Sequence, residues 1–190
     1  MQTIKHMRSY IFFKFLAFKI KLKNQLHKSN TQLIIGQNVQ IFPDLWLRLG
    51  ENSILEIGNN TFIGKGCRIE CSNNARLLIG NNVNLTGYDF LACMKAIEIG
   101  QDTLVGEFVS IRDSNHEYAD LKIPIYSQGY VTKSISISSD VWIGRGCIIL
   151  PGVTIGKHSV IGANSVINQN VDPFSVVGGI PAKLLKKIRE

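Results

Sequence analysis

The chain has 190 residues, of which 45% are hydrophobic and 18% charged, and its formal net charge at pH 7 is +7. This composition excludes a disordered tail and a bundle of membrane-spanning helices, and the length allows one compact core. Residues 1–30 hold seven basic and no acidic residues, so residues 31–190 hold 21 − 7 = 14 basic residues against all 14 acidic ones. Because the excess charge is confined to the N-terminal segment, we expect no nucleic-acid-binding face.

Residues 1–30 are predicted to form a basic amphipathic arm, helical between about residues 5 and 26. Aromatic and aliphatic side chains alternate there with lysines, whose stems can cover apolar surface. One interpretation is a helix that caps the folded body; the other is peripheral contact of residues 5–26 with an anionic membrane surface. The apolar run at residues 10–18 is interrupted by Lys14 and lacks a cleavage site, so we expect a cytoplasmic protein, with any membrane contact at the inner face.

From residue 31 onward, aliphatic residues recur at every sixth position. A phrase that begins with glycine and ends on an aliphatic residue occurs at 36–41, 58–63, 80–85, 100–105 and 156–161. The longest uninterrupted run of the period comprises Ile137, Ile143, Ile149, Ile155, Ile161 and Ile167. A period of six fits neither an amphipathic helix nor a simple alternating strand.

This period predicts an all-β fold, a parallel β-helix over residues 31–172. Each hexapeptide forms a short strand and a corner, one aliphatic side chain points inward, and Gly, Asn or Asp tolerates the turn. Three hexapeptides make one triangular coil of about 18 residues, and stacked coils bury a continuous aliphatic column. Residues 173–190 are predicted to form a C-terminal tail with a short helix.

The cysteines and histidines form no pattern typical of a metal site. The four cysteines, Cys67, Cys71, Cys93 and Cys147, contain no CxxC pair, and we expect them to be buried, reduced thiols. The four histidines are scattered along the chain. We therefore expect no metal ion.

These repeats resemble the hexapeptide-repeat family, which implies a left-handed β-helix, although general connection rules favour the right-handed form. From residue 99 to residue 183 the chain is similar to the sugar O-acetyltransferases related to galactoside and maltose acetyltransferases, and to those of surface-polysaccharide synthesis. The motifs that carry this similarity are Asp113-Ser-Asn-His116, Val141-Trp-Ile-Gly144, Ile149-Leu-Pro-Gly-Val153, Ile161-Gly-Ala-Asn-Ser165 and Gly179-Ile-Pro-Ala-Lys183.

The resemblance implies an acetyl-CoA-dependent O-acetyltransferase that acts on a sugar hydroxyl in lipopolysaccharide, O-antigen or capsule biosynthesis. It also implies a homotrimer with active sites between adjacent subunits. Two alternatives stay open: N-acetylation of an amino sugar by the same machinery, and a non-catalytic β-helix scaffold.

The repeat fails over residues 112–134, and long unpatterned loops in compact domains often carry function. The resemblance makes His116, within this loop, the general base, a role suited to an imidazole that titrates near neutral pH. Asp113 or Glu117 is a candidate to orient the ring, and a backbone carbonyl would serve equally. The alternative for His116 is a loop histidine that only hydrogen-bonds the backbone.

The resemblance also places acetyl-CoA along the C-terminal coils, with contacts from Trp142, Gly144, Arg145, Ala163 and Lys183. Arg145 departs from the small serine of galactoside-type relatives. Trp142 alternatively covers a neighbouring subunit, and Lys183 is alternatively a solvated charge on the C-terminal helix.

Three residues near an inserted corner are candidate contacts for the acceptor. Thr86 stands where galactoside-type relatives have asparagine, which suggests a different acceptor. Tyr88 and Asp89 follow it directly.

Overall fold

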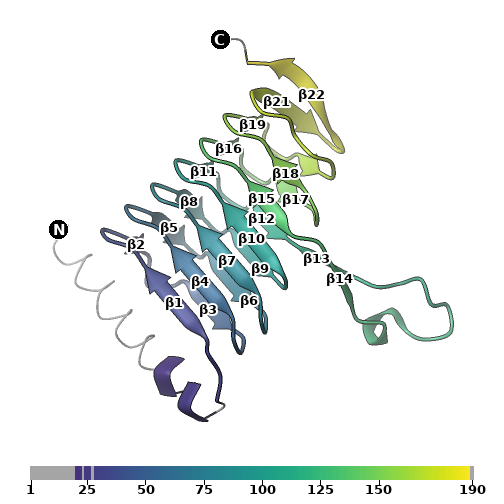
Figure 1. Ribbon diagram of the computed structural model, residues 1–190. Helices are drawn as coiled ribbons and strands as arrows, with labels where there is room; N and C mark the ends of the chain where they lie inside the picture. Colours follow the sequence, from purple (N-terminus) through teal and green to yellow (C-terminus); the bar gives the residue numbers. More distant parts are fainter. Residues whose placement is uncertain (1–19, 23, 27, 189–190) are drawn as a thin grey trace.

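The structure is a computed structural model that describes residues 20–22, 24–26 and 28–188. The described chain winds into a left-handed parallel β-helix, a three-sided prism whose strands lie one above another in successive coils (Figure 1). A two-stranded hairpin projects from the prism near its middle. The predicted fold class is confirmed for the described part of the chain.

Three sheets, here named A, B and C, form the sides of the prism. Sheet A consists of β1 (Gln32–Ile35), β4 (Ile54–Ile57), β7 (Arg76–Ile79), β10 (Ala96–Ile99), β15 (Ile135–Ile137) and β18 (Thr154–Ile155). Sheet B consists of β2 (Gln40–Ile41), β5 (Phe62–Lys65), β8 (Asn84–Gly87), β11 (Leu104–Val105), β16 (Trp142–Ile143), β19 (Val160–Ile161), β21 (Ser175–Gly179) and β22 (Ala182–Lys187). Sheet C consists of β3 (Trp46–Leu49), β6 (Arg68–Cys71), β9 (Phe90–Cys93), β12 (Ser110–Arg112), β17 (Ile148–Ile149) and β20 (Val166–Ile167).

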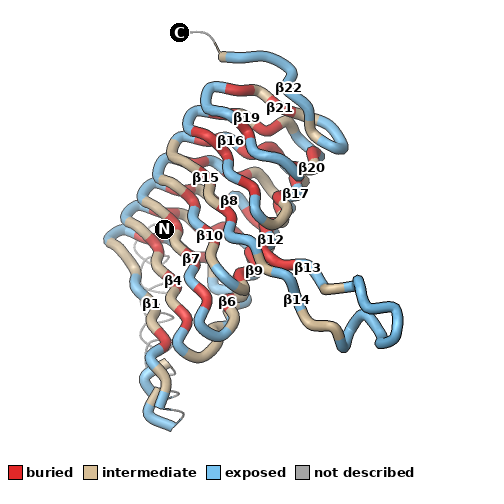
Figure 2. The backbone as a smooth tube through the Cα atoms, turned by 45° about the vertical axis from the view of Figure 1, so that its right-hand side comes forward, coloured by how far each residue is buried: buried red, intermediate tan, exposed pale blue. Residues whose placement is uncertain are grey.

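The hexapeptide aliphatic residues form the core, as the period predicts. All six isoleucines of the longest run are at most 1% exposed, and Figure 2 shows the buried residues running through every coil of the prism. In-register pairing stacks like on like, for example Ile57 on Ile79 and Ile143 on Ile161. Each such side chain contributes about 1.5–3 kcal/mol of burial free energy, so the column stabilises the coils jointly.

The sheets meet at three edges of the prism, named by the sheets they join. The A–B edge comprises residues 36–39, 58–61, 80–83, 100–103, 138–141 and 156–159. The B–C edge comprises residues 42–45, 64–67, 86–89, 106–109, 144–147 and 162–165, and it takes in the last two residues of β5 and of β8. The C–A edge comprises residues 50–53, 72–75, 93–96, 113–134 and 150–153, and it takes in the last residue of β9 and the first of β10.

The A–B edge explains why asparagine stands two residues after the glycine in three of the repeated phrases. Asn38, Asn60 and Asn82 all adopt a left-handed backbone, which asparagine tolerates better than most residues. Their side chains form a ladder, in which the Nδ2 of Asn60 donates to the Oδ1 of Asn82 at 3.2 Å and the Nδ2 of Asn82 donates to Asp102 at 2.7 Å. Each coil therefore bonds the next through side chains as well as through strands.

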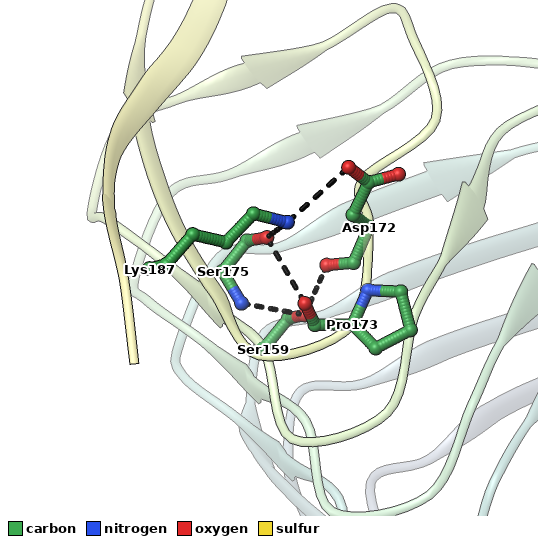
Figure 3. A network of polar contacts seen from close by, with 5 residues as sticks. All are labelled: Ser159, Asp172, Pro173, Ser175 and Lys187. Carbon is green, nitrogen blue, oxygen red and sulfur yellow. Dashed lines mark hydrogen bonds and ion pairs between the residues drawn. The ribbon is translucent and has the colours of Figure 1, made fainter. Parts of the chain in front are cut away.

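The predicted C-terminal helix is wrong: the chain forms strand β22, antiparallel to β21. A helix would leave β21 as an unpaired sheet edge, whereas β22 satisfies its backbone groups. Figure 3 shows the contacts that hold the β21–β22 pair, in which the Lys187 Nζ donates to Asp172 at 3.2 Å and to the Ser175 Oγ at 2.9 Å. The Ser159 Oγ, one coil earlier, donates to the Asp172 carbonyl at 2.9 Å.

The predicted N-terminal helix lies largely outside the described residues, of which 20–22 and 24–26 are helical. Asn24 ties this segment to the first coil, because its Nδ2 donates to the Thr31 carbonyl at 2.9 Å and its Oδ1 accepts from the Thr31 amide at 3.1 Å. Within residues 20–22, 24–26 and 28–188, no helix is long and apolar enough to span a bilayer.

All four cysteines are buried and free, as expected. Burial raises the pKa of Cys67 to about 12 and also raises the pKa of Cys147. Such thiols are poor nucleophiles at neutral pH.

Candidate active site

His116 lies on the hairpin that leaves the prism at the C–A edge. The hairpin pairs β13 (Ser114–His116) with β14 (Tyr130–Thr132), and a 3-10 turn (Ile125–Ser127) follows in its tip. The His116 ring is exposed and lies 4.4 Å from the Tyr130 ring between centroids. A cavity of about 310 Å³ opens beside it, lined by loop residues and by Lys133 and Pro151. The failure of the repeat therefore marks a projecting loop that presents an imidazole to solvent.

Asp113, expected to orient His116, has a different position and different partners. Its side chain is fully buried inside the prism. Its Oδ1 accepts from the Met94 amide at 2.7 Å, and its Oδ2 accepts from the amides of Lys95 and Ala96 at 2.8 and 2.9 Å. Both oxygens are thus engaged by the turn of the preceding coil, so Asp113 is a structural carboxylate rather than a partner of the histidine.

Glu117 also has local partners instead of His116. Its Oε1 accepts from the amides of Tyr118 and Ala119 at 3.1 and 3.3 Å, which fixes the turn after β13. Among the described residues, neither carboxyl group hydrogen-bonds the imidazole. The ring's described neighbour is Tyr130.

The five predicted cofactor residues gather at the C-terminal part of sheet B and the B–C edge. Trp142 is 56% exposed on β16, two residues before Gly144. The Gly144 amide donates to the carbonyl of Ile161, and Ala163 is exposed in the next coil. Lys183 pairs with Gly178 in the coil after that, and its side chain is exposed. The B–C edge and the adjoining residues of sheet B in these successive coils, here called the strip, therefore carry residues that the sequence spaces over forty positions.

Small residues, Gly144 and Ala163, leave few side-chain atoms projecting from this strip. A Cβ at Gly144 would lie 2.7 Å from the Ala163 amide nitrogen, so the two coils approach too closely for any larger residue. Ala163 is exposed in the next coil, and its methyl group adds little bulk to the strip. A narrow chain such as the pantetheine arm of coenzyme A fits such a strip, with the ammonium group suited to its phosphates.

Arg145 belongs to this strip by its backbone, but its side chain extends toward the preceding coil. Its guanidinium carbon lies 5.3 Å from the centroid of the Phe108 ring. Its carbonyl accepts from the Asn164 amide at 2.8 Å in the following coil.

All three predicted acceptor contacts belong to the B–C edge, but only two of their side chains face solvent. Thr86 and Tyr88 are exposed there, whereas Asp89 is 1% exposed inside the prism. Its carboxyl group accepts from the amides of Val109 and Gly87 at 2.9 and 3.2 Å. Burial raises the pKa of Asp89 to about 7. A group enclosed in this way cannot touch an acceptor, so the expectation for Asp89 is wrong.

Phe108, which the sequence reasoning missed, stacks on Tyr88. The two rings lie 5.1 Å apart between centroids at an interplanar angle of 10°, and both are about half exposed. Both residues have positive φ, 56° and 60°, at the corner position that Gly or Asn occupies in other coils of this edge. An aromatic residue aligned with those glycines was the signal available in the sequence.

His116 and the B–C edge lie on opposite edges of sheet C. The hairpin leaves the C–A edge and extends away from the prism (Figure 1), and no hydrogen bond or ring contact joins its described residues to the B–C edge. A single chain therefore does not bring the imidazole to the predicted cofactor strip.

Comparison with known sequences gives matches to bacterial acetyltransferases. Residues 134–169 match the family described as bacterial transferase hexapeptide (six repeats). An Escherichia coli protein named for lipopolysaccharide biosynthesis O-acetyl transfer, WbbJ, is 31% identical over 140 residues, which cover 70% of this chain and 71% of that protein. The E. coli galactoside O-acetyltransferase is 27% identical over 161 residues, covering 82% of this chain and 64% of the enzyme.

Solved structures share the fold. A hexapeptide-repeat acetyltransferase from Vibrio cholerae, solved with acetyl-CoA, has a TM-score of 0.55 and 26% identity, covering all of this chain and 89% of its own. The N-acyltransferase AntD from Bacillus cereus, solved with dTDP and coenzyme A, has a TM-score of 0.72 at 21% identity, covering 83% of this chain and 85% of its own. At that identity, the likeness to AntD concerns the fold alone.

Proposed function

The chain belongs to the hexapeptide-repeat acetyltransferases, enzymes that use acetyl-CoA, and on that premise we propose that its acceptor is a sugar hydroxyl in surface-polysaccharide biosynthesis. The observation that carries the proposal is the projecting His116 in a chain whose WbbJ relative matches over most of both lengths. Transfer to the amine of an amino sugar is the second candidate, and it has the weaker support, because the resemblance to AntD is one of fold.

His116 acts as the general base in this proposal. A neutral ring nitrogen accepts the proton of the acceptor hydroxyl as the oxygen bonds to the acetyl carbonyl carbon. Acetyl-CoA, as the second substrate, supplies the acetyl thioester. Its carbon–sulfur bond breaks, and the proton held by His116 passes to the departing thiolate. The exposure of the ring beside a 310 Å³ cavity leaves room for the acceptor.

The strip at the B–C edge is the proposed site for acetyl-CoA. Trp142 offers an exposed ring, Gly144 and Ala163 keep the surface low, and Lys183 supplies a cation near its C-terminal end. Arg145 contributes its backbone to the same strip.

The proposed assembly is a homotrimer, in which the hairpin of one subunit reaches the B–C edge of its neighbour. The support is geometric, since the histidine and the strip lie on opposite edges of sheet C within one chain. Activity then depends on assembly, so dilution below the subunit dissociation constant should abolish turnover.

The decisive test is thiol release from acetyl-CoA, with purified protein and a panel of free, nucleotide-linked and lipid-linked sugars. His116→Ala should lower kcat by about 10²–10⁴-fold, the usual contribution of a general base. His158→Asn is the matched control, because His158 is an exposed histidine at the A–B edge whose positive φ asparagine also tolerates. Full turnover in His116→Ala would contradict the assignment.

A further inference from the structure

The B–C edge carries two aromatic residues, Tyr88 and Phe108, in a left-handed backbone conformation that smaller residues adopt more easily. Along this edge the left-handed position holds Gly66, Tyr88, Phe108, Gly146 and Asn164 in successive coils. Positive φ is sterically unfavourable for a bulky aromatic residue, whereas Gly and Asn adopt it readily. At these two positions the hydrogen bonds to the preceding coil come from the backbone, since the amides of Tyr88 and Phe108 donate to its carbonyls at 2.7 and 3.1 Å. The fold therefore does not require these two rings.

The edge is shaped to display the rings. A Cβ at Gly66 would lie 2.5 Å from the Tyr88 ring, so the glycine makes room for that ring to lie along the prism. Tyr88 and Phe108 then stack in parallel and stay about half exposed. Together they form a flat apolar surface at the outside of the prism.

The Arg145 guanidinium borders this surface. The Arg145 guanidinium lies over Phe108, and within the described residues its side chain makes no ion pair and no hydrogen bond. A guanidinium in this state offers planar, paired donors that match a phosphate or a carboxylate. The ring pair and the cation are therefore complementary to a ligand with one apolar face and one anionic group.

We propose that Tyr88, Phe108 and Arg145 form the acceptor platform, and that the acceptor is a sugar bearing an anionic group, either phosphate or carboxylate. This inference rests on the proposed function. The C–H face of a pyranose stacks on the aromatic rings, while the guanidinium binds the anion. The platform lies in the coils directly before Gly144 and Ala163, so the acceptor lies at the end of the proposed acetyl-CoA strip.

Ligand binding tests the platform independently of turnover. The probes are glucose 1-phosphate, methyl glucuronoside and methyl glucoside, which share a pyranose and differ in charge, and binding is followed by saturation-transfer NMR with coenzyme A present. Wild-type protein should bind one or both charged probes about tenfold more tightly than the neutral one, as a charge-assisted contact implies. The better charged probe distinguishes a phosphate from a carboxylate source.

Two variants and one control test the individual residues of the platform. Phe108→Asn should weaken binding of every probe that the wild type binds by about tenfold, and Arg145→Gln should remove the preference for charge. Phe174→Asn is the control, because Phe174 is an aromatic residue with positive φ at a different edge. The Kd for acetyl-CoA should stay within about twofold in all three.

Several results would overturn the proposal. They are equal binding of charged and neutral probes by the wild type, unchanged binding by Phe108→Asn, and a raised acetyl-CoA Kd in Arg145→Gln, which would place that residue on the cofactor. Dissociation of Phe108→Asn in light scattering would show that the rings contact a second copy instead. Probe binding by a protein that releases no thiol with any sugar of the panel would contradict the proposed function and leave the platform standing.

Discussion

Removing the Asp113 carboxyl group should lower the stability of the fold rather than the catalytic rate of the folded molecules. The three amides that it accepts, from Met94, Lys95 and Ala96, lie at 2.7–2.9 Å and close the turn into β10. Hydrogen bonds to a charged group contribute about 1.5–3 kcal/mol each. The turn residues are partly exposed, so water replaces part of the loss and the lower value applies.

Asp113→Ala should therefore lower the free energy of unfolding by about 4–5 kcal/mol, three bonds at the lower value. Asp113→Asn, which keeps one acceptor oxygen, should lose about 2 kcal/mol. These are large fractions of the 5–15 kcal/mol typical of whole domains. Urea titration followed by far-UV circular dichroism, at fixed protein concentration, measures both.

The competing role, orientation of His116, makes the opposite prediction. It requires a lower kcat per folded molecule and a shifted pH–rate profile, with little change in stability. If Asp113→Ala unfolds within about 1 kcal/mol of the wild type while its kcat falls more than a hundredfold, the structural role argued from burial is refuted.

Three further predictions concern stability. The pKa of Asp89 is raised to about 7 in the fold, so between pH 4 and 7 the folded state keeps a proton on this carboxyl group that the unfolded state has lost. The free energy of unfolding should therefore fall by at most about 4 kcal/mol as the pH rises from 4 to 7. Asp89→Asn should flatten that slope in urea titrations at several pH values. Gly64→Ala should cost about 3 kcal/mol or more, because its Cβ would lie 1.9 Å from the Thr86 carbonyl oxygen; Gly162→Ala, with 3.4 Å to its nearest atom, is the control, and equal melting temperatures would contradict the clash. Lys187→Met should cost less than about 1 kcal/mol, since its ion pair is largely exposed; a larger loss in thermal denaturation would mean that the hairpin anchors the last coil.

The prism was predictable because its information is local. A period of six appears within any two coils, and each aliphatic position faces the same interior, so Ile57 and Ile161 are interpreted in the same way. The loop containing His116 was predictable for the complementary reason, because the failure of the six-residue period over residues 112–134 marks its position in the sequence.

The failures arise where a residue's role depends on another coil. Asp113 and Asp89 look like loop carboxylates, yet each accepts from backbone amides of a neighbouring coil, seventeen to twenty residues away, which carry no side-chain signature. β22 forms because β21 has an unpaired edge, a condition absent from the composition of residues 182–187. Phe108 was missed because only alignment with Gly66 and Gly146 shows that its backbone is left-handed.

The B–C edge also places equivalent residues of successive coils at a fixed spacing. Successive coils lie about 4.8 Å apart, so a residue moved from one turn to the equivalent turn of the next coil is translated along the axis by one fixed increment, without a change of orientation. From Tyr88 to Ala163 there are three such steps, or roughly 14 Å. A substrate of different length can then be accommodated by moving a binding side chain to the equivalent position of another coil. The distance between the acceptor platform and the acetyl-CoA strip is therefore a whole number of coil spacings.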